Sequence, residues 1–158
     1  MNELFLIGAS ALLVAAAVCD VRSYRIPNVL CGGLALLFAV RAVALGAPYP
    51  LMHLPVAALV FVVCMVLFCR GLMGGGDVKL LAAAVLWIPP ALVPAQILAV
   101  SVAGALIAVL LLLVRRTART GILAGAGGGT PHAAFQDDAP VPYGVAIAIG
   151  TIAYLPLS

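Results

Sequence analysis

The sequence predicts an all-α, polytopic membrane protein with about six transmembrane helices. Of its 158 residues, 66% are hydrophobic and only 8% are charged, and the mean hydropathy is +1.29. A soluble domain carries about 25% charged residues, so this chain lacks the polar residues that a water-facing surface needs. We therefore expect residues 1–158 to form one domain embedded in a lipid bilayer.

Six apolar runs are the expected helices, and turns rich in polar, glycine or proline residues separate them. The runs cover residues 4–19, 29–45, 54–69, 78–88, 91–114 and 143–157. A spanning helix needs about 20 residues, so several helices should extend into their flanking turns. The fourth run is the shortest, and at about 1.5 Å per residue it crosses only about half of a ~30 Å hydrocarbon core. Its glycine-rich start is therefore expected in a cavity that water reaches.

The segments that flank the runs support this order of elements. Glu3 makes the N-terminus acidic, which disfavours a cleaved signal peptide and predicts that the first run is a retained helix. Tyr49 and Trp87 lie in turns with prolines, after the second and fourth runs, and are expected to be interfacial anchors. Residues 115–142 form the longest predicted loop, and the glycine and alanine residues in its middle indicate flexibility.

Basic residues fix the expected orientation. Seven of the eight lie after the first run, at the junction of the third and fourth runs, or after the fifth run: Arg22, Arg25, Arg70, Lys79, Arg115, Arg116 and Arg119. Only Arg41 is placed differently, near the far end of the second run. In a six-helix topology the turns after the first, third and fifth runs share one face, which the positive-inside rule makes cytoplasmic, with both termini on the opposite face. The net charge of +3 is divided among these short turns, so it does not indicate nucleic-acid binding.

Two carboxylates stand out among the apolar residues. Asp20 closes the first run, and Asp77 follows Gly74, Gly75 and Gly76 and opens the fourth. An ionisable group at the edge of a membrane segment is costly and indicates a functional site. Two such groups on the cytoplasmic side predict a pair that shares a proton and activates water, which requires neither a metal nor a cofactor. Helix position alone assigns the proton to Asp20, at a C-terminus, and the charge to Asp77, at an N-terminus.

Residues near the aspartates would shape this site and the substrate path. They are Gly74, Gly75, Gly76, Lys79, Pro27, Asn28, Pro142 and Gly144. Glycines would let a substrate backbone approach Asp77 closely. Pro27 suits the first position of a helix and would fix the turn that carries Asp20. Lys79 is expected on another helix face as an interfacial anchor, and residues 142–144 are expected mainly to start the last helix.

Three segments, in this order, resemble the prepilin peptidases, membrane aspartic proteases that mature type IV pilins. Residues 74–77 have the family's G-x-G-D pattern, residues 20–28 resemble its other aspartate motif, and residues 141–146 resemble a third element. The chain resembles the short form associated with Flp or tight-adherence pili. It has no cysteine pairs like those in the added N-terminal part of the longer enzymes, so no methyltransferase activity is expected.

The resemblance implies that Asp20 and Asp77 are the catalytic dyad of an aspartic endopeptidase without a cofactor. The implied substrate is a prepilin whose short basic leader stays in the cytoplasm and whose hydrophobic helix lies in the membrane. Cleavage would follow a glycine at the cytoplasmic face of the bacterial inner membrane, with both termini of the enzyme on the periplasmic side.

Other interpretations of the two aspartates are open at this point. Asp77 alone would serve as a helix N-cap, and Asp20 alone would pair with Arg22 or Arg25 at the interface. A small ion- or proton-coupled transporter would use Asp20 and Asp77 as ion sites beside a broken helix. A scaffold for pilus assembly would need neither carboxylate.

Overall fold

A computed structural model describes residues 2–46, 50–119 and 141–157, and within these ranges every regular element is a helix. The elements are α1 (Asn2–Ser23), α2 (Asn28–Leu45), α3 (Pro50–Cys69), α4 (Gly75–Val85), η1 (Pro90–Leu92), α5 (Val93–Arg119), α6 (Tyr143–Ile152) and η3 (Leu155–Leu157). The predicted all-α fold is confirmed.

Four of these helices, α1, α2, α3 and α5, are long and apolar enough to cross a membrane. The other two are short, because α4 has 11 residues and α6 has 10. At about 1.5 Å per residue, neither reaches much more than half of a ~30 Å hydrocarbon core. The six apolar runs therefore correspond to six helices in the described ranges, but two of the helices are too short to span a bilayer alone.

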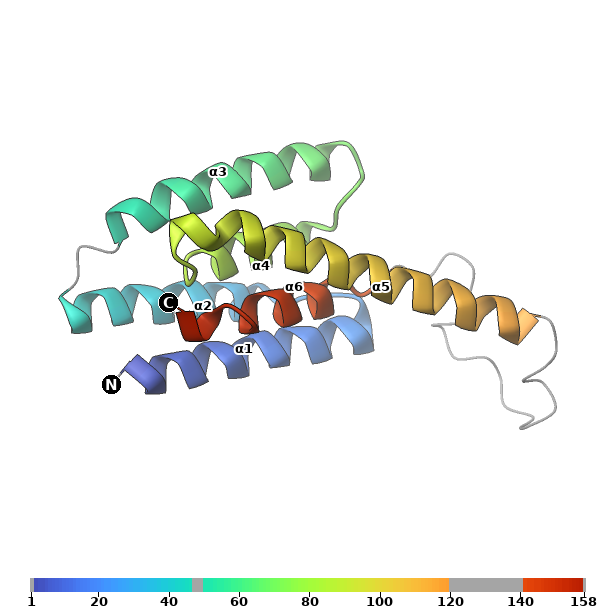
Figure 1. Ribbon diagram of the computed structural model, residues 1–158, viewed down its shortest axis with the longest axis horizontal. Coiled ribbons are helices and arrows are strands. Elements are labelled where there is room, and N and C mark those ends of the chain that lie inside the picture. Colours follow the sequence, from blue (N-terminus) through green and yellow to red (C-terminus); the bar gives the residue numbers. More distant parts are fainter. Residues whose placement is uncertain (1, 47–49, 120–140, 158) are drawn as a thin grey trace.

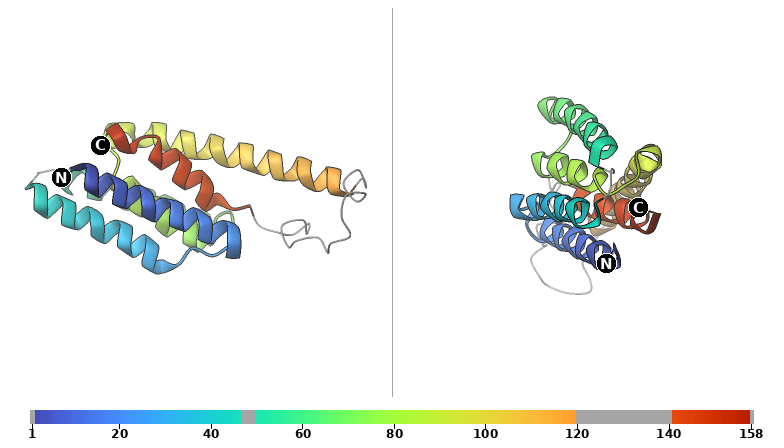
Figure 2. Two further views of the ribbon diagram at one scale, coloured as in Figure 1. Left: turned by 90° about the horizontal axis from the view of Figure 1, so that it is seen from below. Right: turned by 90° about the vertical axis from the view of Figure 1, so that its left-hand side faces the viewer.

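The helices form a ring of four with two outer members (Figures 1 and 2). Around the ring, α1 packs on α2, α2 on α4, α4 on α6 and α6 on α1. The two outer helices are α3, which packs mainly on α4, and α5, which packs mainly on α6. The short helices α4 and α6 are thus held inside the bundle by longer neighbours.

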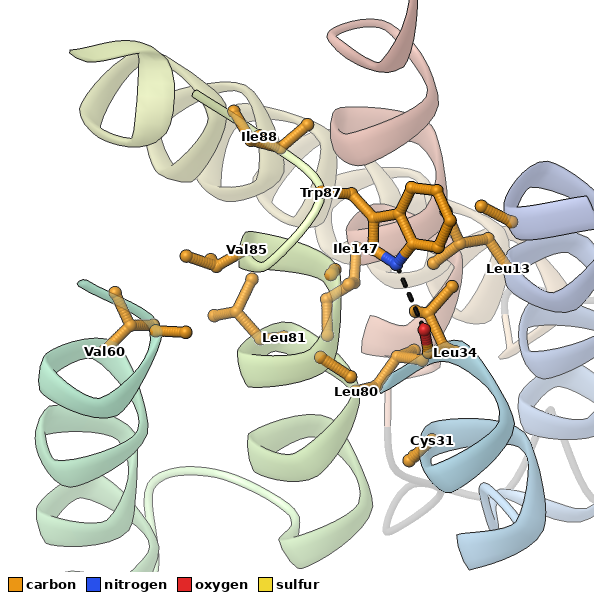
Figure 3. Packing of buried hydrophobic residues seen from close by; sticks show 14 of the residues in the cluster. Leu13, Cys31, Leu34, Val60, Leu80, Leu81, Val85, Trp87, Ile88 and Ile147 are labelled. Atoms are coloured by element: carbon orange, nitrogen blue, oxygen red, sulfur yellow. Dashed lines mark hydrogen bonds between the residues drawn. The ribbon is translucent and has the colours of Figure 1, made fainter. Parts of the chain in front are cut away.

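The centre of the ring is a cluster of large apolar side chains, drawn in Figure 3, around Trp87. Trp87 is fully buried, and its Nε1–H donates to the carbonyl oxygen of Leu34 at 3.2 Å. The prediction that Trp87 anchors the chain at the membrane interface is wrong, because the turn after α4 folds into the bundle. Tyr49, the other predicted anchor, lies outside the described residues.

Two helices, α1 and α3, are each followed by a residue in the left-handed backbone conformation, near the two aspartates. Tyr24 follows α1 with φ 51°, and its N–H donates to the carbonyl of Asp20 at 2.8 Å. Gly71 follows α3 with φ 72°, and the N–H groups of Gly71 and Leu72 donate to Phe68 and Leu67, which is a Schellman motif. These abrupt ends turn the chain back directly after Asp20 and directly before the Gly74–Asp77 segment.

Two predicted boundaries change. Pro27 occupies the N-cap of α2, with φ −61° and ψ 133°, so it lies just before the first helical residue, Asn28, instead of being that residue. The fifth helix continues to Arg119, so residues 115–119 of the predicted loop are helical. Residues 120–140 of that loop lie outside the described ranges.

Candidate active site

Asp20 and Asp77 line the same cavity. Its volume is about 350 Å³, and its lining consists of Asp20, Tyr24, Arg25, Ile26, Asn28, Gly74, Gly75, Gly76 and Asp77. The walls thus come from the turn between α1 and α2 and from the glycine segment at the start of α4. The fold brings together the two carboxylates, the three glycines and Asn28 around this cavity.

Asp20 lies in the last turn of α1 and is only 6% exposed. Its Oδ2 accepts a hydrogen bond from the backbone N–H of Gly144 at 2.7 Å. Gly144 is in the first turn of α6, where N–H groups have no partner within the helix. This contact joins residues 124 positions apart in the chain. The sequence placed Gly144 among the residues that would shape the site, but it gave residues 142–144 mainly the role of starting the last helix and did not predict this hydrogen bond.

Asp77 occupies the third position of α4, because Gly74 is the N-cap. The carboxylate reaches back and accepts the backbone N–H of Gly74, as in the reverse half of a capping box. Asp77 therefore does not serve as the N-cap itself. It precedes the apolar part of α4 and lies outside the four helices long enough to span. Burial and the charge of Asp20 raise the pKa of Asp77 to about 6, while the Gly74 N–H opposes that rise.

Positions 74 and 144 require glycine because each backbone lies too close to a carboxylate for a side chain. A Cβ atom added to Gly74 would lie 2.8 Å from Oδ2 of Asp77, and one added to Gly144 would lie 2.8 Å from Oδ2 of Asp20. Real Cβ atoms essentially never come that close to another heavy atom. Gly76 packs against Ile26, whose Cβ would lie 3.2 Å from an added methyl group. Glycine thus permits the close packing around both aspartates.

Three helices, α2, α4 and α6, begin at the end of the bundle where α1 ends (Figure 1). A helix N-terminus carries partial positive charge and stabilises a nearby anion. Asp77 uses the N-terminus of its own helix, and Asp20 uses that of α6 through Gly144. The unfavourable position of Asp20 at a helix C-terminus is thereby compensated.

Lys79 and Asn28 form a link beside the cavity. The Nζ of Lys79 donates to Oδ1 of Asn28 at 3.0 Å. Lys79 is not part of the cavity lining, in agreement with its predicted position on another face of α4 from Asp77. The hydrogen bond connects the start of α4 to the start of α2. Pro27 and Pro142 are the residues before α2 and α6, and they set the entry of the chain into these helices.

Within the described ranges, no group of three or more His, Cys, Asp or Glu side chains is placed to hold a metal ion. The chemistry that this geometry can support is that of two neighbouring carboxylates in a small, partly polar cavity of a membrane-embedded helical bundle. Such pairs share a proton because two like charges at one site are costly.

The family model of the type IV leader peptidase family matches residues 7–109. The chain belongs to this family, and the matched range contains both Asp20 and Asp77. No curated protein and no solved structure matches the chain. The family identifies a peptidase of the type IV leader class in a helical membrane protein, which favours the peptidase over the transporter interpretation.

Proposed function

We propose that this protein is an aspartic endopeptidase that removes the leader of Flp-type prepilins at the cytoplasmic face of the bacterial inner membrane. The observation that supports the proposal most directly is the cavity shared by Asp20 and Asp77. The segments that line it, the end of α1 and the starts of α2 and α4, lie at the end of the bundle opposite the start of α1 and the end of α6 (Figure 1). Basic residues also lie at the ends of α1 and α5 and directly after α3, at this same end of the bundle, which supports a cytoplasmic orientation.

In the proposed resting state, Asp20 is ionised and Asp77 carries the shared proton. Burial disfavours the charge on both carboxylates, and a backbone N–H opposes this on each, from Gly144 for Asp20 and from Gly74 for Asp77. On Asp77 the charge of Asp20 adds to the effect of burial, and its pKa is raised to about 6. This order is the reverse of the one expected from helix position alone. The difference arises because Asp20 receives a donor from a second helix, α6, that the local sequence around Asp20 does not reveal.

Hydrolysis then follows the general acid–base scheme of two carboxylates. Asp20 takes a proton from water while the water oxygen attacks the scissile carbonyl carbon, and Asp77 gives its proton to the carbonyl oxygen. The resulting gem-diol collapses when Asp20 protonates the amide nitrogen and Asp77 takes back a hydroxyl proton. The C–N bond breaks, and both carboxyl groups return to their starting states.

Co-expression with a Flp-type prepilin tests this function, with leader removal scored by gel shift. Wild type, Asp20→Asn, Asp77→Asn and the control Glu3→Gln are compared at matched membrane levels. Glu3 is an exposed carboxylate in the first turn of the same helix as Asp20, at its opposite end. We expect cleavage by wild type and Glu3→Gln only. Cleavage by either aspartate variant would remove that residue from the mechanism.

A further inference from the structure

An apolar groove runs along the bundle between the two outer helices. Its volume is about 510 Å³, and its lining consists of Leu59, Val60, Val63, Cys64, Leu67, Leu72, Met73, Leu81, Ile97, Val100, Ser101 and Tyr143. The groove exists because α3 packs mainly on α4 and α5 mainly on α6. Figure 2 shows α3 and α5 as separate outer helices of the bundle.

The groove is suited to an apolar helix. Leu59, Val63 and Leu67 of α3 are spaced by four residues and form one wall, and each is more than a third exposed. The hydroxyl of Ser101 in the opposite wall already donates to the carbonyl of Ile97 at 2.8 Å. The groove therefore offers surface for packing and does not call for a polar ligand. In membranes, helix association depends on such packing.

The groove ends beside both aspartates. Met73, at this end, precedes Gly74, whose N–H binds Asp77. Tyr143, also at this end, precedes Gly144, whose N–H binds Asp20. The ring of Tyr143 lies against Gly104 of α5. A peptide that extends from the groove toward the cavity would thus pass Met73–Gly74 and Tyr143–Gly144, the segments that contact the two carboxylates.

Two other apolar pockets on the bundle do not adjoin the segments of both carboxylates. One lies between α1 and α6 and has Arg22 in its lining, so it adjoins only the helix of Asp20 and its partner α6. The other lies between α2, α3 and α4 and has Lys79 in its lining, so it adjoins only the helix of Asp77. The lining of the α3–α5 groove contains no charged residue. Of the three, this groove alone has in its lining the residues that precede the N–H partners of both carboxylates, Met73 before Gly74 and Tyr143 before Gly144.

We infer that the α3–α5 groove holds the hydrophobic helix of the substrate directly after the scissile bond. This inference rests on the proposed function. The soluble leader lies on the cytoplasmic side of the cavity, the scissile bond lies at Asp20 and Asp77, and the first turns of the substrate helix pack along Val63 and Leu67. The groove thereby selects substrates with an apolar helix and sets the position of the cut relative to its start.

The test fills the groove and uses a neighbouring residue as control. Val63→Trp places a large side chain in the groove, whereas Val62→Trp places one on the adjacent face of α3. The two residues are 53% and 58% exposed, and Val62 does not line the groove. We expect Val63→Trp to slow cleavage of a full-length prepilin by about tenfold or more, and Val62→Trp by less than about twofold. A peptide with the leader and only a few following residues should be cleaved at similar rates by both variants.

A second readout uses a benzophenone amino acid at position 63 or 62, in the Asp77→Asn background, which the proposed mechanism makes unable to cleave the substrate. Crosslinking to the prepilin helix from position 63 but not from 62 supports the inference. The inference would be overturned by any of three results: equal crosslinking from both positions, crosslinking only to phospholipid, or equal cleavage by both tryptophan variants. In each case the wild-type protein would still cleave the prepilin. Failure of wild type to cleave any prepilin would instead refute the proposed function.

Discussion

Gly144→Ala is the substitution that most directly tests the geometry around Asp20. The added Cβ atom would lie 2.8 Å from Oδ2, 3.0 Å from Cβ and 3.1 Å from Cγ of Asp20. Ordinary contact begins at 3.4 Å, so the carboxylate oxygen must move by 3.4 − 2.8 = 0.6 Å or the start of α6 must shift. Either movement lengthens the 2.7 Å hydrogen bond from the Gly144 N–H.

The expected loss follows from the energy of that hydrogen bond. Hydrogen bonds to charged groups contribute about 1.5–3 kcal/mol. Because the Gly144 N–H stabilises only the ionised form of Asp20, losing it moves the shared proton from Asp77 toward Asp20 by a factor of roughly 10 to 100. A protonated Asp20 cannot act as the base, so cleavage should slow by up to that factor. The reaction should slow in kcat for both full-length prepilin and a short leader peptide, because the change acts at the dyad and not in the α3–α5 groove.

The assay measures leader removal by purified protein in detergent, with two control variants. Gly32→Ala adds the same methyl group where no atom lies within 4 Å, so its rate should equal that of wild type. Gly150→Ala, also in α6, would bring a Cβ to 2.8 Å from the backbone nitrogen of Val100, so it should lower the melting temperature without lowering kcat per folded molecule. A Gly144→Ala enzyme that is folded and as fast as Gly32→Ala would refute the proposed role of the Gly144 N–H.

Three further predictions concern pH, the link beside the cavity and the bundle. Since Asp77 must carry a proton and its pKa is raised from 3.8 to about 6, kcat/KM should fall as pH rises through about 6, and a pH–rate profile that stays flat from 5 to 8 would contradict this. Lys79→Ala and Asn28→Ala should each slow cleavage by about two- to tenfold, because each removes the same hydrogen bond. The double variant should therefore be no slower than either single variant, and additive losses would exclude a role for the Lys79–Asn28 hydrogen bond. Thr151→Val should destabilise the protein by about 1–3 kcal/mol in thermal unfolding, because it removes the acceptor of the buried Gln96 Nε2, and adding Gln96→Leu should restore most of that loss.

The sequence was sufficient to find the aspartates because polar residues are rare among its apolar runs. The positions of the basic residues predict that Asp20 and Asp77 share one side of the bilayer, and in the structure both line one cavity. The shortness of the fourth helix was also visible in its apolar run. These features depend on local composition and on helix order, which a single sequence contains.

Tertiary contacts could not be obtained in this way. Trp87 follows an apolar run and precedes two prolines, a pattern that a buried turn and an interfacial turn share, so its burial depends on the packing of other helices. Tyr24 adopts a left-handed conformation that non-glycine residues rarely adopt, and nothing in the residue type predicts it. The contact between Gly144 and Asp20 requires that α6 begins at the depth of the last turn of α1, which follows only from the assembled bundle.

The short helices explain how a carboxylate at a helix C-terminus can serve in the proposed reaction. Asp20 is in the last turn of α1, and the first N–H groups of α6 have no partner within their own helix. Because α6 has only 10 residues and is packed between α1 and α5, its first turn meets Asp20 inside the bundle. The first turn of α4 does the same for Asp77 within its own helix. The short helices α4 and α6 thus place two helix N-termini beside two acids, which favours charge there more than the C-terminus of α1 alone would.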